Sequence, residues 1–346
     1  MMHLQSSIDS SWKLGTGKLR VFFILLILPW LLLPQLKTQI DRLEKKLSIT
    51  GGIKRVPILV KLSRNYLDVD LAKADRLIGE AQTYLPNLKD DQLKIELFNQ
   101  KSSVLSYQTK YKESIVYANI SLSIAEKIGD RDRVASALMV KGLAQANLNR
   151  FEEAKKTYSR GLKLVTKTGN RYLIGKINIG IGHIHNMKSE FQQAMDHYRK
   201  GLTMFRLLKN QKEIASARMM VGNVYISMDN HSAALDYLLQ ARRFFERSGH
   251  RRIYAALLND IGILHSNLGD NKAALEMYQK SMALAKAELD KDLYYIVLNN
   301  IGSTYQDAGQ MEKALECYFQ ALEKNKKTRY RLGTAIDLFN IGTVYL

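Results

Sequence analysis

The sequence predicts an all-α solenoid, built from antiparallel helix pairs that recur at a fixed interval. Three observations lead to this fold class. All four prolines lie at or before Pro86, so nothing in the rest of the chain interrupts a helix. The only cysteine, Cys317, excludes a disulfide framework and a cysteine-based metal cluster. Glycine recurs with constant spacing and without an insertion, at Gly142, Gly182, Gly222, Gly262, Gly302 and Gly342.

The N-terminal part begins with a basic n-region, 1–20, and continues with an apolar segment, 21–36, whose core is Val21–Leu33. Thirteen apolar residues are too few for a bilayer span, which takes about 20, and are typical of the h-region of a signal peptide. No small-residue cleavage motif follows. Three interpretations therefore stay open: an export signal that is cleaved or retained, a short uncleaved anchor, and a buried soluble helix.

These interpretations favour a protein that is membrane-associated or exported, with membrane contact through Val21–Leu33. Basic residues both precede and follow the apolar run, so the side of the membrane stays undetermined.

Residues 37–56 are predicted to form a short amphipathic helix and a linker. Its apolar residues are spaced four, three and four apart, which is the pattern of a coiled-coil seam: Leu36, Ile40, Leu43 and Leu47. Two heptads are too few to dimerise stably, so the alternative is a helix that leans on the next domain. Gly51 and Gly52 end this helix and act as the linker.

Residues 57–346 hold seven full repeat units and a truncated eighth. In the unit that begins at Gly142, the next marked positions are Ala154, Tyr158 and Gly161, and later units repeat these offsets. Residues three and four apart share one face of a helix. The offsets therefore predict two antiparallel helices per unit, with small residues at their contact and the aromatic residue between successive units.

The ends of these helices are also marked in the sequence. The second helix is predicted to stop near Gly129, Gly169 and Gly249, because glycine suits a left-handed C-cap and a following Asp or Asn suits a new start. The last residues, Phe339–Leu346, stop inside the first helix of a unit. We therefore expect either that the sequence is a fragment or that another domain or partner covers this end.

This pattern resembles the tetratricopeptide repeat over roughly 57–346. The residues that follow the order of that family in one unit are Ile301, Gly302, Tyr305, Ala314, Tyr318 and Ala321. The unit is longer than the usual length of about 34 residues and lacks the closing proline, so we expect longer helices and not longer loops. The resemblance implies a right-handed superhelix whose inner wall is lined by the first helix of each unit. Units of this length look like those of peptide-receptor and bacterial signalling members.

The resemblance also implies which side chains line the groove. Amide side chains recur there, and an amide carries both a donor and an acceptor for the backbone of an extended peptide. The alternative is that the asparagines bridge adjacent helices. The predicted peptide-binding residues are Lys176, His183, Asn186, Asn223, Asn259, Asn299, Ser303 and Gln306. Met139, Leu143 and Ile179 depart from the two-carboxylate clamp of chaperone-binding relatives, which disfavours C-terminal chaperone tails.

The net charge is +19, and residues 131–210 supply +11 of it, with 16 basic residues against five acidic ones. We interpret this segment as a solvated convex face. The alternative is an attraction for an acidic peptide, an anionic membrane surface or nucleic acid. Nucleic acid is the least favoured of these partners, because no recognised binding motif accompanies the charge.

The sequence shows no catalytic constellation. Gly15-Thr-Gly17-Lys18 lacks the spacing of a phosphate-binding loop, and His183 and His185 are two residues apart, which points their rings to different faces of a helix. We therefore predict a non-enzymatic scaffold without cofactor or metal that binds a peptide or protein segment in its groove. The alternative is the N-terminal sensor portion of a larger signalling protein, with a kinase, cyclase or DNA-binding output. The ligand and the oligomeric state stay open.

Overall fold

The computed structural model describes residues 35–287, 291–327 and 331–345. Within these ranges the chain forms sixteen α-helices and two short 3-10 turns, with no strand. The predicted n-region 1–20 and the apolar segment 21–36, apart from its last two residues, lie outside this part. None of the described helices has the length and apolarity needed to cross a membrane.

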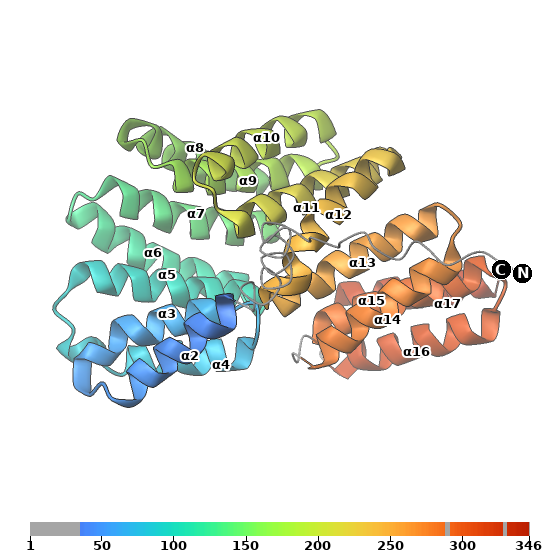
Figure 1. Ribbon diagram of the computed structural model, residues 1–346, viewed down its shortest axis with the longest axis horizontal. Coiled ribbons are helices and arrows are strands. Elements are labelled where there is room, and N and C mark those ends of the chain that lie inside the picture. The colour runs from blue at the N-terminus through green and yellow to red at the C-terminus, as the bar shows by residue number, and fades with distance from the viewer. Residues whose placement is uncertain (1–34, 288–290, 328–330, 346) are drawn as a thin grey trace, which may run out of the picture.

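After α2 (Gln35–Ser48), first and second helices of the repeat alternate along the chain (Figure 1). The first helices are α3 (Val56–Tyr66), α5 (Asp91–Tyr107), α7 (Arg131–Asn147), α9 (Arg171–Met187), α11 (Gln211–Ser227), α13 (Arg251–Asn267), α15 (Lys291–Asp307) and α17 (Arg331–Val344). The second helices are α4 (Leu71–Gln82), α6 (Tyr111–Lys127), α8 (Phe151–Thr168), α10 (Phe191–Leu207), α12 (His231–Ser248), α14 (Asn271–Ala287) and α16 (Met311–Lys327). From α5 onward each kind of helix begins at a constant interval, which confirms the predicted fold class and period.

Short turns separate these helices, and their conformation follows the same period. Gly129, Gly169 and Gly249, the predicted C-caps, have φ of +71°, +74° and +81°. Lys209 occupies the corresponding slot of the fourth unit with φ of +53°. Helices of 17 or 18 residues joined by such short turns account for the long unit, so the added residues lengthen the helices.

The starts of the first helices are capped by side chains in the same register. Asp90, Asp130, Asn170 and Asn210 each accept a hydrogen bond from a backbone N–H of the first turn that follows. An Asp or Asn N-cap satisfies a donor that the helix cannot pair, and contributes about 1 kcal/mol. His250 stands in the same slot before α13 and makes no such bond.

The two helices of a unit pack through a glycine and an aromatic ring. In the unit of α13 and α14, a Cβ on Gly262 would lie 2.5 Å from the ring of Tyr278, which is only 2% exposed. The ring of Tyr158 covers Gly142 of its own unit, and its hydroxyl end reaches Gly180 of the next. The aromatic residue therefore fills space inside its helix pair as well as between units.

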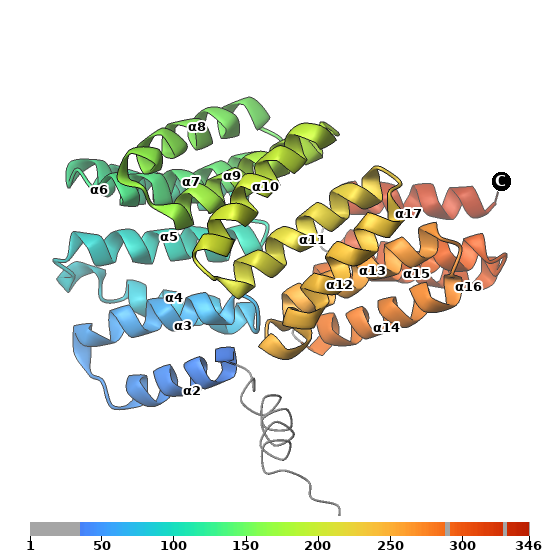
Figure 2. The same ribbon diagram turned by 45° about the horizontal axis from the view of Figure 1, so that its top comes forward.

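The helix pairs stack side by side into a curved array, and the curvature continues from the first unit to the last. Figure 1 shows the first units on one side, α8 to α10 across the top and the last units on the other side. At the N-terminal end, α2 packs on α3, with Leu36 and Ile40 buried in a cluster that also contains Leu59 and Ile78. Figure 2 shows the end of α3 close to the end of α12 and the start of α13 at the centre of the array.

We expect Gly262→Ala to destabilise the fold by about 1–3 kcal/mol, because the added methyl group would overlap the buried ring of Tyr278. Gly79→Ala is the matched control. Gly79 lies inside α4 with nothing within 4 Å of the new Cβ, so this change should stabilise by up to about 1 kcal/mol. Urea unfolding followed by circular dichroism measures both. Equal stabilities of the two variants would contradict the packing role of the glycine.

Candidate functional site

The predicted groove residues lie on four consecutive first helices. Lys176, His183 and Asn186 are half-buried on α9, and Asn223 is half-buried on α11. Asn259 is buried on α13, while α15 carries half-buried Asn299 and Gln306 and exposed Ser303. They occupy four register positions of these helices, six and three residues before the repeat glycine and one and four residues after it, and we refer to this set of positions as the inner wall. Their part in binding stays a prediction.

Several of the amides on this wall bond to the neighbouring first helix. Asn223 Nδ2 donates to Asp260 Oδ2 at 2.8 Å, and Asn300 Nδ2 donates to Asn259 Oδ1 at 2.8 Å. Burial raises the pKa of Asp260 to about 6, against the opposing effect of hydrogen bonds from Asn223 and Asn259. These bonds hold α11, α13 and α15 at a fixed spacing.

The same arrangement continues towards α17. Asn299 Nδ2 donates to Asp337 Oδ1 at 2.9 Å, and Gln306 Nε2 donates to Thr343 Oγ1 at 3.3 Å. For Asn223, Asn259, Asn299 and Gln306 the structure thus shows the bridging role that the sequence left as the alternative. These amide groups already have a partner in the chain, so only part of their hydrogen-bonding capacity is left for a ligand.

Two acceptors on the wall have no partner. The side-chain oxygens Oδ1 of Asn186 and Asn223 are buried and accept no hydrogen bond from the described part of the chain. Most buried polar atoms in proteins are paired, and an unpaired one costs about 1–3 kcal/mol. Both atoms are closed to solvent, so a ligand that brings N–H donors pairs them only after the side chains that cover them shift.

The two histidines of α9 have separate environments. Burial lowers the pKa of His183, which therefore carries no charge at neutral pH. His185 is buried, with Nδ1 2.5 Å from Glu190 Oε2 and its ring stacked 5.6 Å from that of His197. In the described part of the chain no group of three or more His, Cys, Asp and Glu is placed to hold a metal ion.

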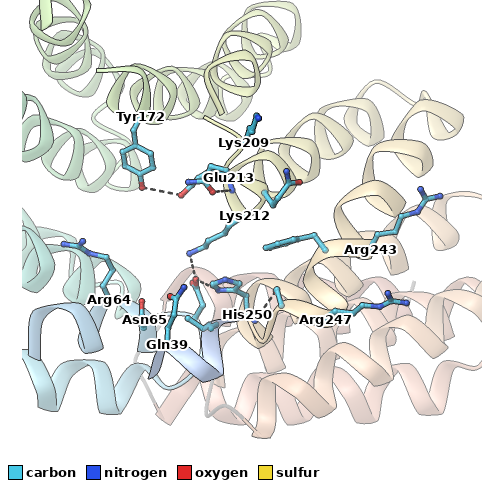
Figure 3. Close-up of a pocket in the computed structure, with 16 residues that line it drawn as sticks. Gln39, Arg64, Asn65, Tyr172, Lys209, Lys212, Glu213, Arg243, Arg247 and His250 are labelled. Carbon is cyan, nitrogen blue, oxygen red and sulfur yellow. Dashed lines mark hydrogen bonds and ion pairs between the residues drawn. The ribbon is translucent and has the colours of Figure 1, made fainter. Parts of the chain in front are cut away.

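A cavity of about 850 Å³ lies where the curvature of the array brings the first unit next to the fifth and sixth. The sequence alone did not predict this cavity. Figure 3 shows it between α2 and α3 on one side and the start of α11 and the end of α12 on the other. Asp68, which is 2% exposed, lies at its floor. Its Oδ2 is 2.7 Å from Lys212 Nζ and 3.1 Å from His250 Nδ1. We call Asp68, Lys212 and His250 the closing cluster.

The electrostatics of the closing cluster favour the ionised carboxylate. Burial would raise the pKa of Asp68, but the hydrogen bond from His250 and the charge of Lys212 outweigh it, and the pKa lies well below its usual range. Burial of Lys212 opposes its charge, yet Asp68 holds the pKa of the ammonium above its ordinary value. The backbone N–H of Arg252 also donates to the carbonyl of Asp68 at 3.0 Å. The first unit is thereby joined to the fifth and sixth.

A second ion pair lies beside the closing cluster. Lys176 Nζ is 3.1 Å from Glu213 Oε2, and Tyr172 donates to the same carboxylate at 3.4 Å. Burial opposes the charge of Lys176, but the carboxylate of Glu213 raises the pKa of the ammonium. Lys176, one of the predicted peptide-binding residues, is therefore already engaged in joining α9 to α11.

One sequence signal could have marked this region, although our predictions did not use it. The slot before α5, α7, α9 and α11 holds Asp90, Asp130, Asn170 and Asn210, and His250 breaks the series before α13. Because His250 does not cap α13, its side chain is available to bond Asp68, 182 residues earlier in the chain. The change from Asp or Asn to His thus marks His250 as unusual in the sequence. Its partner, Asp68, is brought near only by the curvature of the array.

Comparison with known proteins identifies the repeat. Sequence models described as tetratricopeptide repeat match residues 135–164, 213–287 and 295–327. No curated protein matches this chain.

Solved structures share the fold. The structure titled NprR in complex with its cognate peptide NprX is 15% identical, with a TM-score of 0.59 over 94% of this chain and 98% of that one. A Rap protein complexed with Competence and Sporulation Factor is 13% identical, with a TM-score of 0.60 over 89% and 92%. Aspartyl phosphate phosphatase F from Bacillus subtilis is 15% identical, with a TM-score of 0.57 over 81% and 74%. At these identities the likeness establishes the fold alone.

We expect Asp68→Asn to destabilise the protein by about 3 kcal/mol at neutral pH, because Lys212 would lose its buried partner. The pKa of the folded carboxyl lies below the ordinary value of 3.8, so its stabilisation is complete above about pH 4 and is lost as the pH falls further. The difference between parent and variant in urea unfolding should therefore shrink on acidification. Asp229→Asn, in an exposed turn, is the control. A pH-independent difference would contradict this account.

For Asp260 we expect the opposite effect, namely that the ionised carboxylate lowers the stability of the fold. Its folded pKa of about 6 exceeds the ordinary value of 3.8, so ionisation destabilises the fold increasingly between about pH 4 and pH 6 and constantly above. Asp260→Asn should stabilise by about 1–2 kcal/mol at pH 8, allowing for partial exposure, and by nothing at about pH 3. Thermal unfolding at both pH values tests this. A variant that is less stable than the parent at pH 8 would refute it.

Proposed function

The chain is a tetratricopeptide-repeat protein, and we propose that it is a non-enzymatic scaffold that binds a peptide or an extended protein segment on its inner wall. The observation that carries this proposal is the pair of buried, unpaired acceptors of Asn186 and Asn223. An extended peptide presents backbone N–H groups, and each hydrogen bond to such an acceptor contributes on the order of 1 kcal/mol.

One similar structure holds a peptide, which supports a peptide as the ligand, and a second is a complex with a named factor. The titles of these structures describe NprR with its cognate peptide and a Rap protein with Competence and Sporulation Factor. Both span nearly the whole of the described array. The feature that they share with this chain is the fold, a stack of antiparallel helix pairs.

The chemistry of the side chains supports a scaffold and not an enzyme. Cys317 is buried, and burial raises the pKa of its thiol to about 11, so the thiolate nucleophile is scarce at neutral pH. His185 is held by Glu190, and the carboxylates Asp68 and Glu213 are held by lysines. Each of these groups has a structural partner that accounts for its position.

A second proposal is that the array serves as the sensor portion of a larger signalling protein. Leu338 and Phe339 on α17 are 52% and 70% exposed, and such an apolar face is suited to a contact with another protein surface. Membrane association or export through Val21–Leu33 stays a proposal that rests on the sequence alone.

We expect Asn186→Ala to weaken peptide binding about five- to tenfold while leaving the stability unchanged or higher, because the change removes an unpaired acceptor. Peptides are first selected on the parent protein from a random library displayed on phage. Their affinities for parent and variants are then measured by isothermal titration calorimetry. Asn267→Ala, an exposed residue at the end of α13, is the matched control.

Two results would overturn the proposed function. One is a selection that yields no peptide binding to the folded array. The other is a set of selected peptides whose affinities fall equally with Asn186→Ala and Asn267→Ala, since the inner wall would then play no special part.

A further inference from the structure

The cavity at the closing cluster has an excess of basic side chains at its edge. We define Arg64, Lys209, Arg243 and Arg247 as the basic rim. All four line the cavity, are exposed, and have no carboxylate partner in the described part of the chain. Figure 3 shows Arg64 on one side of the cavity and Arg243 and Arg247 on the other.

The carboxylates of the cavity do not neutralise this rim. Asp68 is bound to Lys212 and His250, and Glu213 is bound to Lys176. Each carboxylate thus has its own cation, and the charges of the basic rim are left over. A concave region lined by unbalanced charge of one sign attracts a ligand of the opposite sign and raises its rate of association.

In the turn between α10 and α11, Lys209 occupies the position that is glycine in the equivalent turns of three other units. Gly129, Gly169 and Gly249 take left-handed φ values without strain, whereas Lys209 adopts φ of +53° with a full side chain. A left-handed conformation costs a residue other than glycine roughly 1–2 kcal/mol. The exception places one more cation at the edge of the cavity.

The floor of the cavity offers an acceptor. Asp68 is 2% exposed, and its Oδ1 has no hydrogen-bond partner in the described part of the chain, in contrast to its Oδ2. This acceptor is closed to solvent, so a ligand that fills the cavity meets the cations at the edge directly and reaches Oδ1 only after the side chains that cover it shift. A peptide has backbone N–H groups that can donate to Asp68 and, if it is acidic, carboxylates that can pair with the basic rim. The cavity volume of about 850 Å³ lies in the range of ligand pockets.

We propose that this cavity binds an acidic peptide segment, which crosses it in an extended form with carboxylates at the basic rim and backbone donors towards Asp68. This inference rests on the proposed peptide-binding function and adds to it the charge of the ligand and a place on the array. The cations come from α3, the turn before α11 and the end of α12, and three of the four lie outside the basic segment 131–210.

The test uses a fluorescein-labelled peptide of alternating glutamate and serine, titrated with the parent protein and followed by fluorescence anisotropy. A peptide with glutamine in place of glutamate is the ligand control. We expect the glutamate peptide to bind and the glutamine peptide to bind at least about tenfold more weakly. Binding of the glutamate peptide should also weaken as salt is added.

Variants then locate the site. Arg243→Gln with Arg247→Gln should weaken binding about tenfold. Lys155→Gln with Lys156→Gln removes the same charge from the exposed face of α8 and should change the affinity less than twofold. Lys209→Gly relieves the left-handed turn, so it should weaken binding about threefold while leaving the fold as stable as the parent or more stable. Circular dichroism with urea checks the stability of each variant.

Several outcomes would overturn the inference. They are no binding of the glutamate peptide, equal loss from the cavity and α8 variants, and a labelled single-stranded DNA that binds in place of the peptide with the same dependence on Arg243 and Arg247. If library-selected peptides still bind in an Asn186-dependent manner, the proposed function stands and only the acidic ligand is refuted. If no peptide of any kind binds, both are refuted.

Discussion

The contact between a glycine of one helix and a large apolar side chain of the next sets the spacing on which the rest of the array depends. Tyr158, Tyr198, Leu238, Tyr278 and Tyr318 each lie over the glycine in the first helix of the same unit. Because the glycine has no side chain, the ring or the leucine takes that space, and the two long helices come close enough to share one core. Because this contact recurs at a constant interval, successive helix pairs stack in the same way and build a long curved array.

Curvature then brings together residues that are far apart in the chain. Asp68 meets Lys212 and His250, 144 and 182 residues away, only because the helix pairs between them accumulate the necessary turn. A buried ion pair of this kind needs each charge to be matched, which Asp68 and Glu213 achieve with separate lysines. The closing cluster therefore fixes the distance between the first unit and the fifth, and with it the shape of the cavity.

The fold was predictable because its determinants are local and repeated. The glycine interval, the C-caps at Gly129, Gly169 and Gly249, and the Asp and Asn starts are all visible within one unit of sequence. The positions of the groove residues on α9 to α15 follow from the same register. Their partners did not follow, since the bonds from Asn223 to Asp260 and from Asn299 to Asp337 join neighbouring units and depend on side-chain choice. The cavity was hidden for a stronger reason, because its lining comes from α2, α3, α9, α11 and α12 and the turns beside them.

The central claim is that the array closes through Asp68 and holds one defined shape. Pulsed electron paramagnetic resonance between spin labels on Lys61→Cys in α3 and Leu239→Cys in α12, with Cys317→Ser, measures this most directly; both positions are exposed and lie outside the cavity lining. A closed array predicts a single narrow distribution of distances between the labels at neutral pH. A broad distribution in a folded, helical protein would contradict the claim, because the first and fifth units would then move independently.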